Sequence, residues 1–200
     1  FHSAKICLYS VDFEEIEQLQ RADDWEVAGK ILADAAKKVE AGGADFLVIC
    51  TNTMHKVVPQ IESRITIPIL HIADATAENL IKDNKHTVGL LGTRFTMEQA
   101  FYKDCFSKKY GLKVVVPDES SRNRVHHIIY QELCQGIISD SAREEYLNII
   151  NELVTKGADA VILGCTEIGL LIKQAHTGIQ LYDTSIIHAQ AAIDLALSRK

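Results

Sequence analysis

Two short segments of the sequence carry side chains that could move a proton. The first is Gly164-Cys165-Thr166-Glu167, in which a thiol stands beside a hydroxyl and a carboxylate. The second is Thr51-Asn52-Thr53, which offers hydroxyl and amide groups. A cysteine thiol ionises at a pKa of about 8.5, which nearby donors or a helix start can lower, whereas an aliphatic hydroxyl ionises far above neutral pH. Cys165 is therefore the candidate base, and the hydroxyl and amide groups are candidates for stabilising a developing negative charge.

Each segment follows a short apolar run, and such runs alternate along the chain with amphipathic stretches. Apolar residues recur at helical spacing between Ala28 and Val39, and Gly42 and Gly43 follow as a stop signal. Short apolar runs separated by helices are typical of the α/β class with parallel sheets. The runs predict strands at Ile6–Val11, Phe46–Cys50, Ile67–His71, Val88–Gly92, Lys113–Val116, Ala160–Leu163 and Gln180–Tyr182.

An internal repeat relates the two segments. Gly43-Ala44-Asp45 and Gly157-Ala158-Asp159 each introduce an apolar strand at a constant offset of 114 residues, from Gly43 to Gly157, and the helices before them keep this offset. In this register Thr51 is the equivalent of Cys165. Both should stand at the carboxyl end of a parallel strand, the edge where open α/β sheets bind ligands.

The repeat predicts two related α/β halves. We expect a first domain over residues 1–84 and a second over residues 85–184, with a C-terminal helix over residues 185–200 that packs back on the first. The polar run from Lys82 to His86 marks the boundary. The first strand of the first domain is expected to be missing from the sequence.

Composition narrows the functional classes. The 200 residues carry a formal net charge of −6, which argues against general nucleic-acid binding. The sequence contains no run of roughly 20 apolar residues that could form a membrane helix. It also contains no signal segment. Its five cysteines form no CxxC pair, so we expect reduced thiols and a cytoplasmic protein. Three of them are expected to be buried and inert: Cys7, Cys105 and Cys134.

The sequence resembles the aspartate/glutamate racemase family over nearly its whole length. The matching motifs are Thr51-Asn52-Thr53-Met54-His55, where the family has Cys-Asn-Thr-x-His, Gly164-Cys165-Thr166-Glu167, and Gly89-Leu90-Leu91-Gly92-Thr93-x-x-Thr96. The resemblance implies two pseudosymmetric Rossmann-like or flavodoxin-like domains, an active-site cleft between them, and isomerase activity on a small amino acid. It also implies a cysteine on either side of the α-carbon, with no cofactor and no metal.

The chain departs from this pattern at Thr51, which replaces the first catalytic cysteine. A slip of one residue to Cys50 would turn its side chain to the other face of the strand, so we interpret Cys50 as structural. In the related racemases the second-half cysteine deprotonates the L-enantiomer. We therefore predict Cys165 and Thr51 as the catalytic pair, with activity biased towards L-substrates.

Polar side chains beside this pair are the predicted substrate contacts: Asn52, Thr53, Thr93, Thr96, Thr166 and Glu167. A distal carboxylate would need a cationic or multi-donor partner, and the sequence leaves several candidates open: the histidines and Arg21, Lys56, Arg94, Arg122 and Arg124. We also expect a homodimer. Two alternatives remain at this point, namely a one-cysteine decarboxylase or isomerase of the same superfamily, and a non-catalytic amino-acid-binding module.

Overall fold

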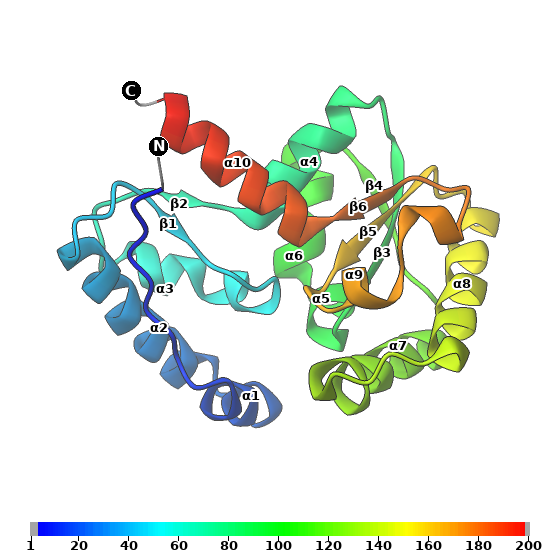
Figure 1. The fold of residues 1–200 in the computed structure, drawn as a ribbon, viewed down its shortest axis with the longest axis horizontal. Helices are drawn as coiled ribbons and strands as arrows, with labels where there is room; N and C mark the ends of the chain where they lie inside the picture. Colours follow the sequence, from blue (N-terminus) through cyan, green and yellow to red (C-terminus); the bar gives the residue numbers. More distant parts are fainter. Residues whose placement is uncertain (1–3, 199–200) are drawn as a thin grey trace. The chain divides into compact units, whose positions relative to one another are not determined.

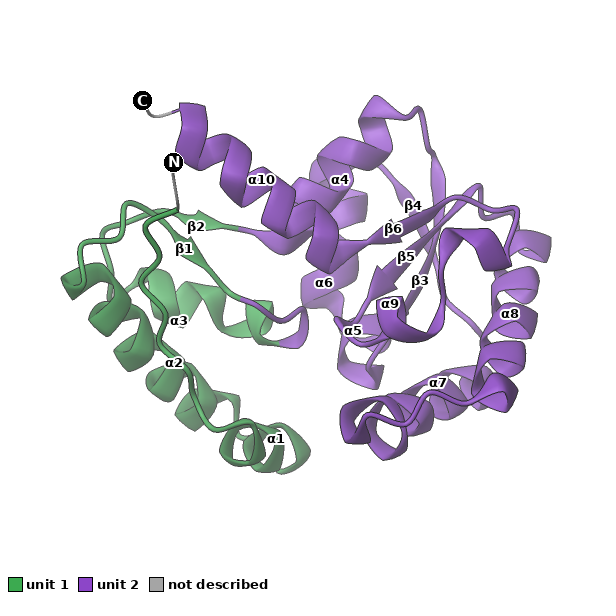
Figure 2. Cartoon of the chain, viewed as in Figure 1, with its two compact units in different colours: residues 1–49, 54–70 green, residues 50–53, 71–200 purple. Residues whose placement is uncertain are grey.

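The computed structural model describes residues 4–198 of the chain. These residues form two compact units, which Figure 2 shows in different colours. Unit 1 comprises residues 1–49 and 54–70, and unit 2 comprises residues 50–53 and 71–200. Helices alternate with parallel strands in both units, which confirms the predicted α/β class.

Unit 1 packs helices around a two-stranded parallel sheet, in which Leu47 is the register partner of Ile69. Asp24 caps the longest helix by accepting a hydrogen bond from the backbone N–H of Val27, as expected for an N-cap aspartate. This helix covers the predicted stretch from Ala28 to Val39. The elements of unit 1 are α1 (Phe13–Arg21), α2 (Trp25–Ala41), β1 (Leu47–Val48), η1 (Thr53–Val57), α3 (Val58–Glu62) and β2 (Ile69–Leu70).

Unit 2 is built on a four-stranded parallel sheet in the order β4-β3-β5-β6. Its strands are β3 (Thr87–Gly92), β4 (Lys113–Val115), β5 (Ala160–Gly164) and β6 (Leu181–Asp183). All five residues of β5 are buried, as expected for a central parallel strand covered on both faces. In Figure 1, α7 and α8 lie on one side of these strands, and α4, α6 and α10 lie on the other.

The helices of unit 2 carry apolar faces that complete a single core around the sheet. Helix α10 packs along α4. Between residues 4 and 198, every helix is too short or too polar to cross a lipid bilayer. The α-helices are α4 (Ile72–Lys82), α5 (Arg94–Glu98), α6 (Ala100–Asp104), α7 (Glu119–Gln131), α8 (Asp140–Thr155), α9 (Ile168–Leu171) and α10 (Thr184–Ser198), and the shorter helices are η2 (Cys105–Lys109, a π-helix), η3 (Leu133–Gln135) and η4 (Gln174–His176).

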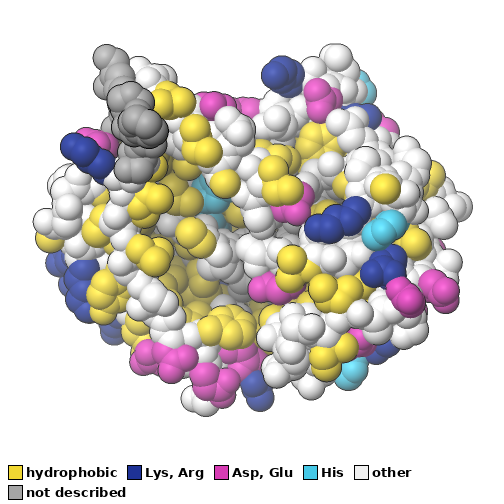
Figure 3. All heavy atoms as spheres, in the orientation of Figure 1, with side chains coloured by type: hydrophobic (Ala, Val, Ile, Leu, Met, Phe, Trp, Pro, Cys, Tyr) yellow, Lys and Arg dark blue, Asp and Glu magenta, His cyan; other side chains and the backbone are white. Residues whose placement is uncertain are grey.

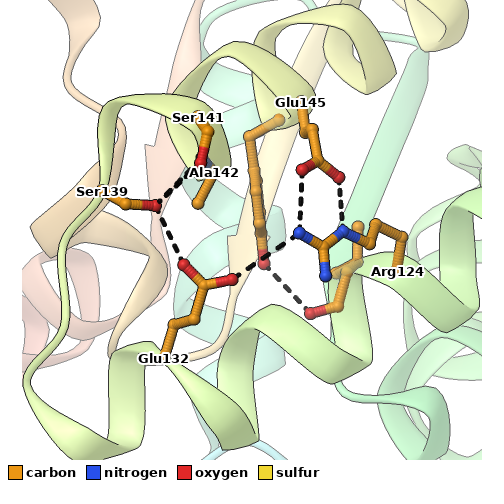
Figure 4. Close-up of polar contacts among 8 residues, drawn as sticks. Arg124, Glu132, Ser139, Ser141, Ala142 and Glu145 are labelled. Carbon is orange, nitrogen blue, oxygen red and sulfur yellow. Dashed lines mark hydrogen bonds and ion pairs between the residues drawn. The ribbon is translucent and has the colours of Figure 1, made fainter.

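A charged network joins α7 to α8, as Figure 4 shows. Arg124 of α7 holds the carboxylate of Glu145 on α8 through two nitrogens, one of them 2.8 Å from the nearest oxygen. Glu132 accepts a hydrogen bond from Ser139 at 2.9 Å, just before α8 begins. This bidentate pairing joins the two helices. The ring of Tyr146, which lies on α8, is buried.

The two halves of the internal repeat share a backbone feature that explains their common Gly-Ala-Asp sequence. Gly43 and Gly157 have φ values of +87° and +93°, a left-handed conformation that glycine adopts without steric cost. Each turns the chain from a helix into the strand that follows. The repeat in sequence therefore reflects a repeated turn geometry.

The predicted strand at Ile6–Val11 is wrong. Residues 4–12 form neither helix nor strand, and the side chains of Ile6 and Leu8 are each 80% exposed. Hydrophobic side chains are visible in Figure 3 over the part of the surface where this segment runs. An apolar run indicates a tendency to form a strand, but a strand also needs backbone hydrogen bonds to a neighbour, and residues 4–12 form no ladder with either described sheet.

The compact units and the predicted domains differ in one respect. Helices α4 and α10 both belong to unit 2, although α4 falls within predicted domain 1–84. Helix α10 packs against α4, and residues 199–200 of the predicted helix lie outside the described residues. The division of the sequence into domains at residue 84 stays a prediction.

Two glycines that are register partners, Gly92 and Gly164, allow β3 and β5 to approach closely at their carboxyl ends. A Cβ atom on Gly92 would lie 2.8 Å from the carbonyl oxygen of Gly164. We expect Gly92→Ala to lower the free energy of unfolding by roughly 1–3 kcal/mol, because backbone cannot move aside as a side-chain tip can. Urea denaturation measures this loss.

Gly178→Ala is the matched control, because a Cβ there meets no atom within 4 Å. Its free energy of unfolding should stay within about 0.5 kcal/mol of the parent value. Equal stability of the two variants would contradict the close approach at Gly92.

Candidate active site

The carboxyl ends of the unit 2 strands carry the residues that the sequence singled out. Cys165 directly follows β5, and Thr93 directly follows β3 as the N-cap of α5. Figure 1 shows α5 and α9 near the ends of these strands. Residues 50–53 also belong to unit 2, so all eight predicted site residues lie in one compact unit.

The thiol of Cys165 is buried and in contact with a carboxylate. Its S–H group donates a hydrogen bond to Oε2 of Glu167 at 2.9 Å. Burial raises the pKa of the Cys165 thiol well above its usual value, and the negative charge of Glu167 adds to this shift. The sulfur is therefore held as a neutral thiol at neutral pH, with a proton acceptor already in place.

Asn52 anchors the segment 50–53 to unit 2 through both ends of its buried amide. Its Nδ2 donates to Oγ1 of Thr184 at 3.0 Å, and its Oδ1 accepts from the hydroxyl of Tyr102 at 2.5 Å. The hydroxyl of Thr184 in turn donates to the carbonyl oxygen of Leu163 at 2.9 Å. This chain of bonds runs from α6 to β5, two residues before Cys165.

A row of buried threonine hydroxyls forms a second link. Oγ1 of Thr53 lies 3.1 Å from Oγ1 of Thr93, which lies 3.2 Å from Oγ1 of Thr96. The Thr93 hydroxyl also accepts the backbone N–H of Thr96 at 3.4 Å, as an N-cap does. The row thus ties the residue after Asn52 to the end of β3, and each hydroxyl can donate to only one acceptor.

The remaining predicted residues lie nearer to solvent. Thr51 and Thr166 are half-buried, and Cys50 is exposed. The expectation that Cys7, Cys105 and Cys134 are buried is wrong, because Cys7 is exposed and the other two are half-buried. Cys7 belongs to the segment that packs as coil, and the other two lie on short helices at the edge of the core.

The candidate cations differ in their partners. Arg21 pairs with Glu17, Lys56 lies 3.7 Å from the centre of the Trp25 ring, and both belong to unit 1. Arg122 forms an ion pair with Glu98, and Arg124 forms ion pairs with Glu132 and Glu145. Arg94 is exposed, follows Thr93 directly, and has no ion-pair partner among residues 4–198.

Sequence reasoning missed two residues of this site. Thr184 directly follows β6, so the rule that located Thr93 and Cys165 could have found it too. Tyr102 lies on α6, where its tyrosine side chain is fully buried. Its contact with Asn52 joins residues 50 positions apart, and no local pattern in the sequence indicates it.

Comparison with known proteins agrees with the geometry. The family model for Asp/Glu/hydantoin racemases matches residues 2–192. A crystal structure of a Yersinia pestis protein of the Asp/Glu racemase type is 49% identical, with a TM-score of 0.91 over 98% of this chain and 85% of that one. The structure of an aspartate racemase homologue from Pyrococcus horikoshii is 34% identical, with a TM-score of 0.84 and the same coverage.

A curated relative extends the comparison to a protein with a described activity. The broad specificity amino-acid racemase RacX of Bacillus subtilis is 24% identical over 185 residues, which cover 89% of this chain and 76% of RacX. The family model spans nearly the whole sequence, and the two solved structures share its fold over nearly all of it. The chain belongs to the Asp/Glu/hydantoin racemase family.

Proposed function

We propose that the protein is an amino-acid racemase that acts on aspartate, glutamate or both without a cofactor. The observation that carries this proposal is the contact between the Cys165 thiol and the Glu167 carboxylate at the carboxyl end of β5. Membership of the family and the amino-acid racemase activity of RacX support the reaction type. Free thiols at all five cysteines fit a reducing cytoplasm.

The first step is removal of the α-proton from the L-enantiomer. Glu167 takes the thiol proton from Cys165, and the resulting thiolate takes the α-proton of the substrate. The raised pKa of Cys165 means that little thiolate exists without this transfer. The positive α-ammonium group of the substrate favours the thiolate when it enters, because an opposite charge lowers a thiol pKa.

The second step returns a proton to the opposite face. Thr51 occupies the position that the repeat pairs with Cys165, and its hydroxyl is too weak an acid and base to serve directly. Thr51 instead holds a water molecule, which protonates the carbanion and becomes hydroxide. The proton that Glu167 accepted neutralises this hydroxide through solvent, so that Glu167 is again a carboxylate and Cys165 again a thiol. Deprotonation of the D-enantiomer from this side is slow because water is a far weaker base than a thiolate.

Charge that develops on the substrate carboxylate is met by the polar groups around Asn52, namely Thr53, Thr93, Thr96 and Thr166. The side chains of Asn52, Thr53, Thr93 and Thr96 are held by hydrogen bonds before substrate arrives, so little reorganisation of these four is needed during reaction. Arg94 binds the distal carboxylate, because it adjoins Thr93 and no acidic side chain among residues 4–198 neutralises it.

The protein also forms a homodimer in this proposal. Helix α10 exposes large apolar side chains on its outer surface, and such clusters on soluble proteins commonly mark interfaces. They are Ile186, Ile193 and Leu197.

Replacing Glu167 separates two roles that its carboxylate could have. Removing the negative charge lowers the pKa of Cys165, because Glu167 helps to raise it. If the carboxylate only repelled the thiolate, Glu167→Gln would therefore speed exchange. As the proton acceptor, its loss should slow exchange of the L-substrate α-proton in deuterated water by roughly 10²–10⁴-fold.

Glu144→Gln is the matched control, because Glu144 is an exposed carboxylate on α8. Its exchange rate should equal that of the parent, and Cys165→Ser should abolish exchange. A Glu167→Gln variant as fast as the parent would remove Glu167 from the proton path.

The exchange rate of the parent should rise from pH 7 towards alkaline pH, because the raised pKa of the Cys165 thiol lies above neutrality.

Thr51→Cys restores the thiol that this chain lacks. We expect exchange of the D-substrate α-proton to rise by roughly 10²-fold, because a thiol replaces a hydroxyl at the same position. NMR in deuterated water follows both enantiomers. Thr51→Ser keeps a hydroxyl and should leave D-exchange near the parent rate. Equal D-exchange in both variants would rule out Thr51 as the partner of Cys165.

Arg94→Gln tests the distal carboxylate. We expect KM for L-aspartate or L-glutamate to rise at least about tenfold, because a charge-assisted hydrogen bond contributes roughly 1.5–3 kcal/mol. The KM for a neutral amino acid should change little. Arg64→Gln, at an exposed arginine paired with Asp34 in unit 1, serves as the control. Parallel rises for acidic and neutral substrates would contradict this role.

A further inference from the structure

Three side chains of different ligand chemistry meet where α4 begins. His71 is the N-cap of α4, Asp74 lies in its first turn, and Cys105 is the first residue of the π-helix η2. One ligand atom from each lies within 4.8 Å of the other two. In the part of the chain that the structure describes, this is the one group of three or more His, Cys, Asp or Glu side chains placed so closely. All three belong to unit 2.

The spacing suits a small tetrahedral cation. The Cys105 thiol donates a hydrogen bond to Oδ1 of Asp74 at 3.3 Å. Zinc bonds sulfur at about 2.3 Å and nitrogen or oxygen at about 2.0–2.2 Å, which places tetrahedral ligand atoms roughly 3.3–3.8 Å apart. The pair of Cys105 and Asp74 already has this separation. The ligand atom of His71 lies within 4.8 Å of the other two, so the site requires a side-chain rotation wherever this distance exceeds the tetrahedral separation.

We propose that His71, Asp74 and Cys105 form a binding site for a thiophilic divalent cation of the zinc type. Nitrogen, oxygen and sulfur donors in one group favour zinc over magnesium or calcium, which bind through oxygen. Three protein ligands leave a fourth position for water. The site is independent of the proposed racemisation, because Cys165 and Glu167 are not among its ligands.

The imidazole of His71 already has the protonation state that a cation requires, whereas the Cys105 thiol must lose its proton when the cation binds. Burial lowers the pKa of His71, so its imidazole is neutral at pH 7 and keeps a lone pair. Its Nδ1 accepts the backbone N–H of Ala73 at 3.2 Å, so a cation bound at that nitrogen replaces one capping hydrogen bond. Burial and the Asp74 carboxylate raise the pKa of the Cys105 thiol to about 12. Binding of the cation forms the metal–sulfur bond and releases the thiol proton to solvent.

One neighbouring charge opposes the cation. The ammonium group of Lys109 lies 2.7 Å from Oδ2 of Asp74, the carboxylate oxygen that Cys105 does not contact. The Lys109 side chain is 58% exposed, so it can turn into solvent when the cation binds. Lys109 therefore weakens the site without blocking it, and its removal should strengthen binding.

Cobalt(II) reports directly on a thiolate ligand through charge-transfer absorption in the near ultraviolet. We expect the full chain, with its thiols reduced, to bind one equivalent and show this absorption. Cys105→Ser should abolish it. The double variant Cys7→Ser/Cys50→Ser, which removes the two exposed thiols, should retain it. Absorption that persists in Cys105→Ser, or that disappears in the double variant, overturns the assignment.

Zinc competition against the cobalt form tests the other ligands. Asp74→Asn should weaken zinc binding at least about tenfold, with circular dichroism showing that the variant is folded. Lys109→Gln should tighten it about fivefold, the effect of one unit charge near 4 Å in water. Parent affinity in folded Asp74→Asn, or unchanged or weaker affinity in Lys109→Gln, would contradict a cation bound to this carboxylate. These readouts need no racemase activity.

Discussion

The buried amide of Asn52 is the interaction on which the arrangement of the site depends. Its nitrogen and its oxygen are bonded to different elements, Thr184 at the start of α10 and Tyr102 on α6. Each hydrogen bond contributes only about 1 kcal/mol net, but a buried polar atom left without its partner costs roughly 1–3 kcal/mol. The amide therefore has one favourable position, which also places Thr51 before it and Thr53 after it. Since Thr184 also binds the backbone of β5, the same bonds reach the strand that carries Cys165.

Much of this arrangement could be predicted from sequence because it follows from backbone periodicity. The central strands β3 and β5 of unit 2 are buried almost throughout, and apolar runs predicted all four strands of this unit to within one or two residues. The repeat placed Thr51 and Cys165 in the same register, and the equivalent glycines, Gly43 and Gly157, share one turn geometry. The wrong strand at Ile6–Val11 has a similar apolar pattern but pairs with neither described sheet. Local pattern records the tendency to form a strand, whereas pairing is a property of the whole fold.

The polar contacts were harder to predict, for a different reason. The sequence marked Glu167 as a substrate contact because it is charged and close to Cys165, but whether it faces ligand or sulfur depends on the turn after β5. In the structure it accepts the thiol hydrogen bond. Tyr102 contacts Asn52 only because α6 packs beside the segment 50–53. Cys105 contacts Asp74 only because the π-helix η2 packs against α4. These contacts depend on the tertiary fold, and the spacing of residues along the sequence does not predict them.

Structural symmetry and chemical symmetry are separate properties in this protein. The sequence repeat makes Thr51 the equivalent of Cys165, although Cys165 directly follows β5 and Thr51 lies three residues after β1. A hydroxyl and a thiol also differ greatly in acidity. Burial raises the pKa of Cys165, so the proposed reaction depends on the Glu167 carboxylate that accepts the hydrogen bond of this thiol. The first-half equivalent of Glu167 is Thr53, which has no carboxylate. Its hydroxyl is hydrogen-bonded to that of Thr93. The first half thus lacks both the ionisable group and the neighbouring carboxylate, and the proposed preference for one enantiomer rests on this paired difference.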